Sequence, residues 1–199
     1  MSHQLPQINI KIKSGQEQLT SNGSTIGIKL IDFWKWSVSD LISNATRGRF
    51  AEFIVASALG INMENVRDEW SAYDLISPEG IKIEVKSAAY IQSWHQRDFS
   101  KINFSIKTAR YWDRSTNVQH LTPSRHSDFY VFCLLKHQDQ PTLDPMNLDQ
   151  WEFYVVSTVE ISNYKRSQSS ITLKSLLNLT KSVKYSELRQ AILDRNERL

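Results

Sequence analysis

Asp74, Glu84 and Lys86 are the residues of this sequence whose types and spacing best suit chemistry. They lie in residues 73–86, a stretch that alternates polar and apolar residues on both sides of residues 77–80, Ser-Pro-Glu-Gly. Proline presets the first central position of a type I turn, and glycine accommodates the left-handed conformation that closes a three-residue loop. The stretch therefore predicts a β-hairpin.

The turn also predicts the register of this hairpin. If Ser77 pairs with Ile81, Asp74 lies directly opposite Glu84, and Lys86 follows on the same face as Glu84. Side chains opposite each other in an antiparallel pair have Cβ atoms about 5 Å apart. Two carboxylates at that distance repel unless one is protonated or a cation lies between them. A divalent metal ion bound by oxygen ligands would satisfy both carboxylates.

The charged residues also have a simpler interpretation. An acid two residues before a lysine, as in Glu84-Val85-Lys86, is expected about once by chance in a chain of this composition. A half-exposed antiparallel strand carries a charged outer face without any chemistry. The hairpin alone therefore leaves both interpretations open.

Length and composition indicate a globular protein with one sizeable core. The chain has 199 residues, of which 40% are hydrophobic and 11% aromatic. We predict an N-terminal extension or hairpin over residues 1–29 and a single domain over residues 30–199. No apolar run reaches the length of a membrane span, and no signal-peptide pattern opens the chain, so we expect a cytoplasmic protein without membrane contact. The lone Cys133 excludes a disulfide framework or a thiolate zinc site.

The net charge is only +3, but the charges are unevenly distributed. Residues 84–126 hold seven basic and three acidic residues, interleaved with aromatic residues, whereas residues 137–160 hold five acidic residues and no Lys or Arg. Basic and aromatic groups together suit contact with nucleic-acid phosphates and bases, although a solvated loop would look similar. The candidate contacts are Arg97, Lys101, Lys107, Arg110, Arg114 and Arg125.

Residues 44–61 predict a helix that is apolar on nearly every side and therefore buried. Glu52 lies among these apolar residues. A buried carboxylate costs several kcal/mol unless it is paired, protonated or near a metal ion. Glu52 is therefore a second candidate for the site, and an internal ion pair with Arg47 or Arg49 is the alternative.

The remaining patterns predict an α/β fold with a mixed central β-sheet flanked by helices. Residues 30–42 have helical spacing. Residues 129–135 form the unbroken apolar run of a strand covered on both faces, and residues 151–159 alternate as a second central strand. Residues 171–179 and 186–194 are typical of two short helices.

This order of parts resembles the restriction-endonuclease-like, or PD-(D/E)XK, phosphodiesterase superfamily. The matching features are a helix with Glu52, a hairpin with Asp74, and a strand with Glu84 and Lys86, followed by two apolar strands. The resemblance implies an α-β-β-β-α-β core. Tyr73 stands where the motif has proline.

The resemblance also implies roles for these residues. Asp74, Glu84 and the backbone carbonyl of Val85 would bind Mg²⁺, with Mn²⁺ as a substitute. Glu52 would act through a water molecule on the ion or as a further ligand. Lys86 would orient or help to deprotonate the attacking water and stabilise charge on the phosphate.

The implied function is Mg²⁺-dependent hydrolysis of DNA phosphodiester bonds, of the restriction or the repair and recombination type. The alternative is a non-catalytic domain of the same fold that binds nucleic acid or another partner. A homodimer would suit cleavage of both strands, but no stretch of the sequence identifies an interface.

Overall fold

The computed structural model describes residues 8–113, 116–119 and 121–198. Its described residues form two compact units, the first from residues 8–39 and 62–68, the second from residues 40–61 and 69–198. The predicted domain boundary between residues 29 and 30 falls inside the first unit. Compact units do not by themselves test domain limits, so that boundary stays a prediction. Within the described ranges, no helix is long and apolar enough to cross a membrane.

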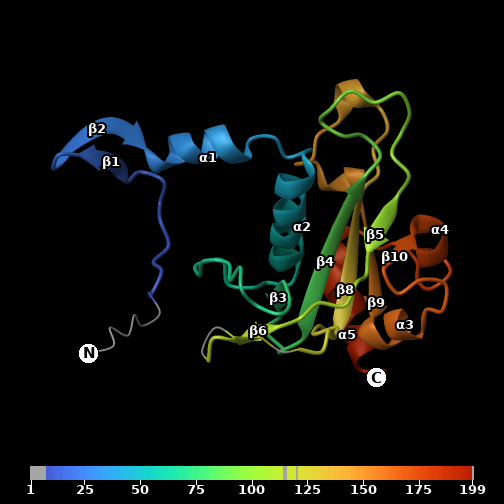
Figure 1. Cartoon of the computed structure of the whole chain (residues 1–199). Coiled ribbons are helices and arrows are strands. Elements are labelled where there is room, and N and C mark those ends of the chain that lie inside the picture. The colour runs from blue at the N-terminus through green and yellow to red at the C-terminus, as the bar shows by residue number, and fades with distance from the viewer. Residues whose placement is uncertain (1–7, 114–115, 120, 199) are drawn as a thin grey trace. The chain divides into compact units, whose positions relative to one another are not determined.

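The first unit contains a hairpin and a helix. Strands β1 (Gln18–Ser21) and β2 (Ser24–Lys29) are antiparallel, and helix α1 (Leu30–Val38) follows at once (Figure 1). Asn22 and Gly23 join the strands with φ values of 49° and 78°. Two successive positive φ values are those of a type I′ turn, for which Asn-Gly is the preferred sequence. Helix α1 ends at Val38, so it is shorter than the helix predicted over residues 30–42.

The second unit is built on a four-stranded sheet. Its strands lie in the order β3 (Leu75–Ile76), β4 (Lys82–Ala89), β8 (Phe129–Leu135) and β9 (Trp151–Ser157). Strands β4 and β8 are parallel, whereas the two outer pairs are antiparallel. The predicted α/β fold with a mixed sheet is therefore confirmed.

One face of the sheet is covered by helices α2 (Asn44–Ala58) and α5 (Leu188–Asn196). Both helices share a hydrophobic core with alternate residues of the strands, among them Val85 and Cys133. Phe53, however, is 54% exposed. The expectation that α2 is buried on nearly every side is therefore wrong, because one side of the helix packs on the sheet and the other faces solvent.

The opposite face is covered by shorter elements. These are the antiparallel pair β5 (Asn103–Ser105) and β10 (Ser170–Thr172), with helices α3 (Thr158–Asn163) and α4 (Leu173–Leu176). The helix predicted over residues 171–179 is instead a short strand followed by one helical turn, because the side chain of Thr172 accepts a hydrogen bond from the Ser175 amide and begins the helix there.

A separate antiparallel pair, β6 (Trp112–Asp113) and β7 (Val118–Gln119), lies in the basic segment. The predicted sheet strand at residues 129–135 is confirmed as β8, and all seven of its residues are buried. Strand β9, expected to be central, instead ends the four-stranded order. Its outer side is covered in part, because Phe153 and Val183 exchange two backbone hydrogen bonds of 3.1 and 2.8 Å.

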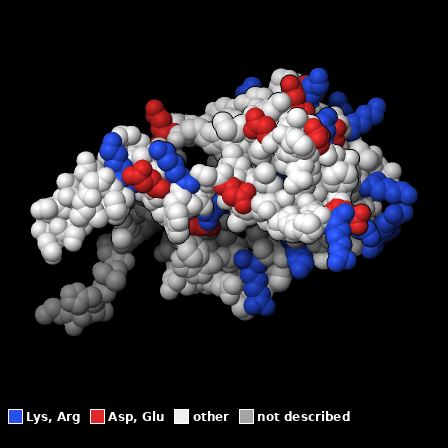
Figure 2. All heavy atoms as spheres, turned by 90° about the horizontal axis from the view of Figure 1, so that it is seen from above, with Lys and Arg blue, Asp and Glu red and all other residues white. Residues whose placement is uncertain are grey.

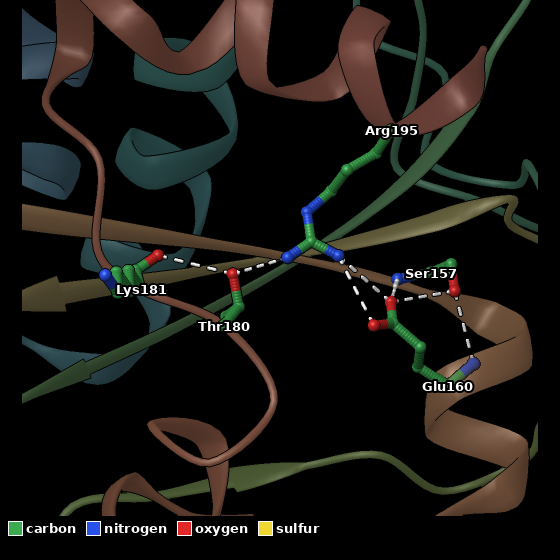
Figure 3. A network of polar contacts seen from close by, with 5 residues as sticks. All are labelled: Ser157, Glu160, Thr180, Lys181 and Arg195. Atoms are coloured by element: carbon green, nitrogen blue, oxygen red, sulfur yellow. Dashed lines mark hydrogen bonds and ion pairs between the residues drawn. The ribbon is translucent and has the colours of Figure 1, made fainter. Parts of the chain in front are cut away.

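A polar network holds α5 to the region where β9 passes into α3 (Figure 3). The Glu160 carboxylate accepts hydrogen bonds from the Ser157 amide and hydroxyl at 2.8 and 2.9 Å. Arg195 of α5 donates to the same carboxylate at 3.2 Å and to the Thr180 hydroxyl at 2.8 Å. The Glu160 carboxylate therefore completes the capping box that Ser157 begins, and it also holds Arg195.

Substituting Glu160→Ala should lower the free energy of unfolding by about 1–3 kcal/mol, because it removes the carboxylate half of the capping box and leaves the Arg195 guanidinium without this partner. Chemical denaturation monitored by circular dichroism measures the change. Glu197→Ala, an exposed glutamate just after α5, is the control and should change stability little. Equal stability of both variants would show that the network does not stabilise the fold.

Candidate active site

The hairpin has the register that its turn predicts. Leu75 pairs with Ile83, and the Ser77 amide donates to the Ile81 carbonyl at 2.9 Å. Gly80 has a φ of 85° and donates to the Ser77 carbonyl, which closes the loop. Since Leu75 lies opposite Ile83, the preceding residue of this strand approaches Glu84, as expected.

Asp74 is held in place immediately before β3. Its amide donates to the Ile83 carbonyl at 3.1 Å. Its side-chain Oδ2 accepts a hydrogen bond of 2.7 Å from the amide of Val85. Because the paired residues of β3 begin at Leu75, the carboxylate takes the place that a backbone carbonyl would have in a longer strand. The position of this acid is therefore set by the backbone of β4.

Lys86 brings the two acids together. Its ammonium group forms an ion pair with Glu84, and its Nζ lies 4.0 Å from Oδ2 of Asp74. The side chains are only partly exposed, at 29% for Lys86, 20% for Asp74 and 22% for Glu84. The structure thus places three of the four predicted catalytic residues in one cluster.

Burial and neighbouring charges shift the pKa values of Glu84 and Lys86. Burial raises the pKa of Glu84, and the charges of Asp74 and Glu52 raise it further, against the opposite effect of Lys86. Burial lowers the pKa of Lys86, but Glu84 and Asp74 together outweigh it, so the net pKa lies above the ordinary value. Lys86 is therefore held in its protonated form by the two carboxylates.

Glu52, the fourth predicted residue, lies on the partly buried side of α2. It acts on the cluster through its charge, which contributes to the raised pKa of Glu84. Arg47 and Arg49 are the arginines proposed as its alternative partners. Arg49 forms an ion pair of 3.2 Å with Glu69, and Arg47 is part of the buried network described below. The role of Glu52 stays a prediction.

The donor atoms fit a Mg²⁺ ion that keeps several water or phosphate ligands. Mg²⁺ is typically held by one or two carboxylates together with water and substrate oxygens. Asp74 and Glu84 supply two carboxylates, and the Val85 carbonyl projects to the same edge of β4 as the amide that binds Asp74. No group of three His, Cys, Asp or Glu that would hold a metal occurs among the described residues. An ion at these two carboxylates would take its further ligands from water or phosphate oxygens.

A buried polar network fixes α2 to β4 next to this cluster. Arg47 is 3% exposed and donates to the Ile42 carbonyl, to Gln92 at 3.1 Å and to Ser87 at 3.4 Å. Burial lowers the pKa of its guanidinium to about 10. Ser87 directly follows Lys86, so this network sets the position of the helix against the C-terminal half of β4.

Tyr130 is a residue of this region that sequence reasoning missed. It is the ladder partner of Glu84 on β8, is buried, and has a pKa raised by burial and by the charge of Glu84. Arg125 lowers that pKa, and its Nη2 donates to the Ile106 carbonyl at 2.9 Å. The tyrosine was hidden in an apolar run, where its only signal was a hydroxyl among hydrocarbon side chains.

The other basic candidates lie on the surface. Arg97, Lys101, Lys107 and Arg110 are exposed. Arg114 lies outside the described residues. These four exposed side chains are available for contact with a polyanion, and their role in binding stays a prediction.

Comparison with known proteins finds a matching family and similar solved structures. The model of a family described as "Bacteriophage T4 endonuclease IV" matches residues 3–175. No curated protein matches the chain. Among solved structures, the bacterial homing endonuclease I-Ssp6803I is 19% identical, with a TM-score of 0.43, and the match covers 78% of this chain and 96% of that one.

If the acidic cluster holds a divalent ion, millimolar Mg²⁺ or Mn²⁺ should raise the melting temperature by about 2–4 °C for each kcal/mol of binding energy. Asp74→Asn should abolish this rise, because the amide keeps an acceptor for the Val85 amide but loses the charge. Differential scanning fluorimetry with and without EDTA measures the effect. Asp98→Asn, at an exposed position, should respond like the wild type. A full metal response in Asp74→Asn would place the ion elsewhere.

Proposed function

This chain belongs to the bacteriophage T4 endonuclease IV family, and we propose that it is a metal-dependent endonuclease that hydrolyses DNA phosphodiester bonds at the cluster of Asp74, Glu84 and Lys86. The observation that carries the proposal is the arrangement of two partly buried carboxylates around one protonated lysine. We further assign the core to the restriction-endonuclease-like group, on the order of Glu52, Asp74, Glu84 and Lys86 along the chain.

In this proposal Asp74 and Glu84 hold Mg²⁺ together with the Val85 carbonyl. A bound ion would neutralise charge on the phosphate and promote ionisation of the attacking water. Asp74 is suited to binding because its carboxylate is already oriented by the Val85 amide. Glu84 gains most from a cation, because burial and the neighbouring acids disfavour its ionised form.

Lys86 acts as a cation in this proposal. The two carboxylates hold its pKa above the ordinary value, so the ammonium form is available to donate hydrogen bonds to a phosphate oxygen and to the attacking water. This favours orientation of the water and stabilisation of charge over removal of a proton by Lys86. The ammonium group also keeps the two acids together before substrate arrives.

Substrate binding would rest on the exposed basic residues of the second unit. Basic side chains gather at the right-hand edge of the view in Figure 2, whereas acidic and basic residues are mixed over the rest of that face. Neutralisation of phosphates by Lys and Arg supplies affinity for DNA of any sequence. DNA is thus the proposed substrate, and specificity for a sequence or strand is a separate property.

Lys86→Ala should reduce DNA cleavage by about 100- to 1,000-fold, because it removes an oriented cation from the reacting phosphate. Cleavage of plasmid and linear DNA in Mg²⁺ or Mn²⁺, followed on gels, measures the loss, and EDTA should abolish the wild-type activity. Lys174→Ala, at an exposed position on α4, is the matched control and should cleave normally.

Unchanged cleavage by Lys86→Ala would reject this assignment. Wild-type protein that binds DNA but leaves it intact with every divalent ion would instead support a non-catalytic binding domain.

Alanine substitution of Arg97, Lys101, Lys107 or Arg110 should weaken DNA binding similarly for all sequences and lower the slope of log affinity against log salt by about 1 for each phosphate that is no longer neutralised. Fluorescence anisotropy in EDTA measures binding without cleavage. Arg125→Ala should differ, because Arg125 donates to backbone carbonyls and its removal should lower stability. If none of the four surface variants changes this slope, these residues do not bind phosphates.

A further inference from the structure

We propose that Arg47 is a positioning residue for the candidate active site, because its side chain fixes helix α2, which carries Glu52, against strand β4, which carries Lys86. The inference rests on the proposed function, since it concerns the same cluster. Arg47 lies in the first turn of α2 and is 3% exposed. It is therefore too deeply buried to contact DNA, and the proposed reaction does not explain its charge.

The Arg47 guanidinium donates hydrogen bonds to neutral acceptors. Nη1 donates to the Ile42 carbonyl at 2.7 Å and to the Gln92 side chain at 3.1 Å. Nη2 donates to the Asn44 side chain at 2.6 Å, and Nε to the Ser87 hydroxyl at 3.4 Å. These acceptors belong to the turn before α2, to α2 itself, to β4 and to the segment after β4. One buried side chain thus joins segments that are distant in sequence.

The charge of this side chain costs free energy that an apolar side chain would not. Burial disfavours the cation, and although the nearby charge of Asp40 favours it, the pKa of Arg47 falls to about 10. The group is still a cation at neutral pH. A guanidinium carries its N–H donors in one rigid plane, so it holds several acceptors in a fixed arrangement, which Lys and Met cannot do. The advantage of arginine here is therefore the fixed geometry of the joined segments.

The joined segments meet beside the candidate active site. Ser87 directly follows Lys86, and because side chains alternate along a strand, Ser87 faces α2 while Lys86 projects from the opposite side of β4. Glu52 follows Arg47 on α2, about 7.5 Å further along the helix axis. Its charge contributes to the raised pKa of Glu84, so this helix residue interacts with the acidic cluster. A shift of α2 along β4 would change the distance between them.

The network also holds the segment that follows β4. The Gln92 side chain donates to the Ala89 carbonyl at 2.8 Å and to the Ser100 hydroxyl at 3.2 Å. The Gln92 amide donates to the side chain of Gln96 at 2.6 Å. Arg97, one of the exposed residues proposed to contact DNA, lies in this segment. The buried guanidinium is therefore tied to the helix, to the strand and to a segment that carries a candidate DNA contact.

The test measures Arg47→Lys, Glu52→Gln and the double variant, with Arg49→Lys as the matched control. Lys keeps the charge and the stem of Arg47 but not the planar set of donors, and Arg49 is an exposed arginine of the same helix. Circular dichroism gives the folded fraction of each protein. The measured quantity is the rate of DNA cleavage per folded molecule, with Mg²⁺ and saturating protein.

We expect Arg47→Lys and Glu52→Gln each to lower this rate about 10- to 100-fold, because small displacements of catalytic groups have effects of this size. The double variant should be no slower than the slower single variant, since both changes remove the same contribution of Glu52. Arg49→Lys should cleave like the wild type. If Arg47→Lys does not fold, Arg47→Met answers the same question, because an apolar group often replaces a buried charge at little cost in stability.

Two results would overturn the inference. One is a rate per folded molecule of the Arg47 variant equal to that of the wild type, which would make Arg47 only a stabilising residue. The other is a loss in the double variant equal to the product of the two single losses, which would show that Arg47 does not act through Glu52. Parallel assays of the wild type and Lys86→Ala separate these outcomes from failure of the proposed function, in which the wild type itself leaves DNA intact.

Discussion

The hydrogen bond between the Val85 amide and the Asp74 carboxylate is the interaction on which the candidate site depends. Strand β3 pairs with β4 only from Leu75 onward, so the acid side chain, and not a backbone carbonyl, meets this amide of the sheet. A carboxylate that accepts a backbone N–H is restrained in both position and orientation. The end of a very short strand thereby becomes the place where a charged group can be held next to a central strand.

This restraint creates an electrostatic conflict that Lys86 relieves. Glu84 faces Asp74 in a partly buried position, and both burial and like charge disfavour its ionised form. An ammonium group between the two acids offsets part of that cost. A divalent ion and a phosphate would redistribute the same charges, with the cation at the acids and Lys86 free to turn toward the phosphate. Two carboxylates beside one ammonium group leave a net negative charge at the cluster when all three groups are ionised.

The local features of the site could be predicted from the sequence, whereas the features that depend on tertiary packing could not. Pro78 and Gly80 determine the loop, and the loop determines which residue lies opposite Glu84. The register of the hairpin can therefore be predicted from the local sequence. The edge position of β9, the solvent-facing side of α2 and the pairing of Tyr130 with Glu84 all depend on elements distant in sequence. Hydrophobic periodicity shows that a strand is covered, but it does not show what covers it. The edge of β9 is covered in part by the segment around Val183 and not by a fifth strand of the sheet.

The packed strands of the sheet differ from the exposed segments around them in how firmly they are held. Strand β4 lies between two covered faces, and the buried Arg47 network ties its end to α2, so Glu84 and Lys86 stand on a strand that is packed on both sides. The segments around Trp70 and Trp112 instead have contacts at the surface, among them the ion pair between Glu69 and Arg49 and the contact between the two indole rings. Exposed ion pairs contribute little stability. Exposed outer segments can therefore move at a lower cost in free energy than the strands of the sheet.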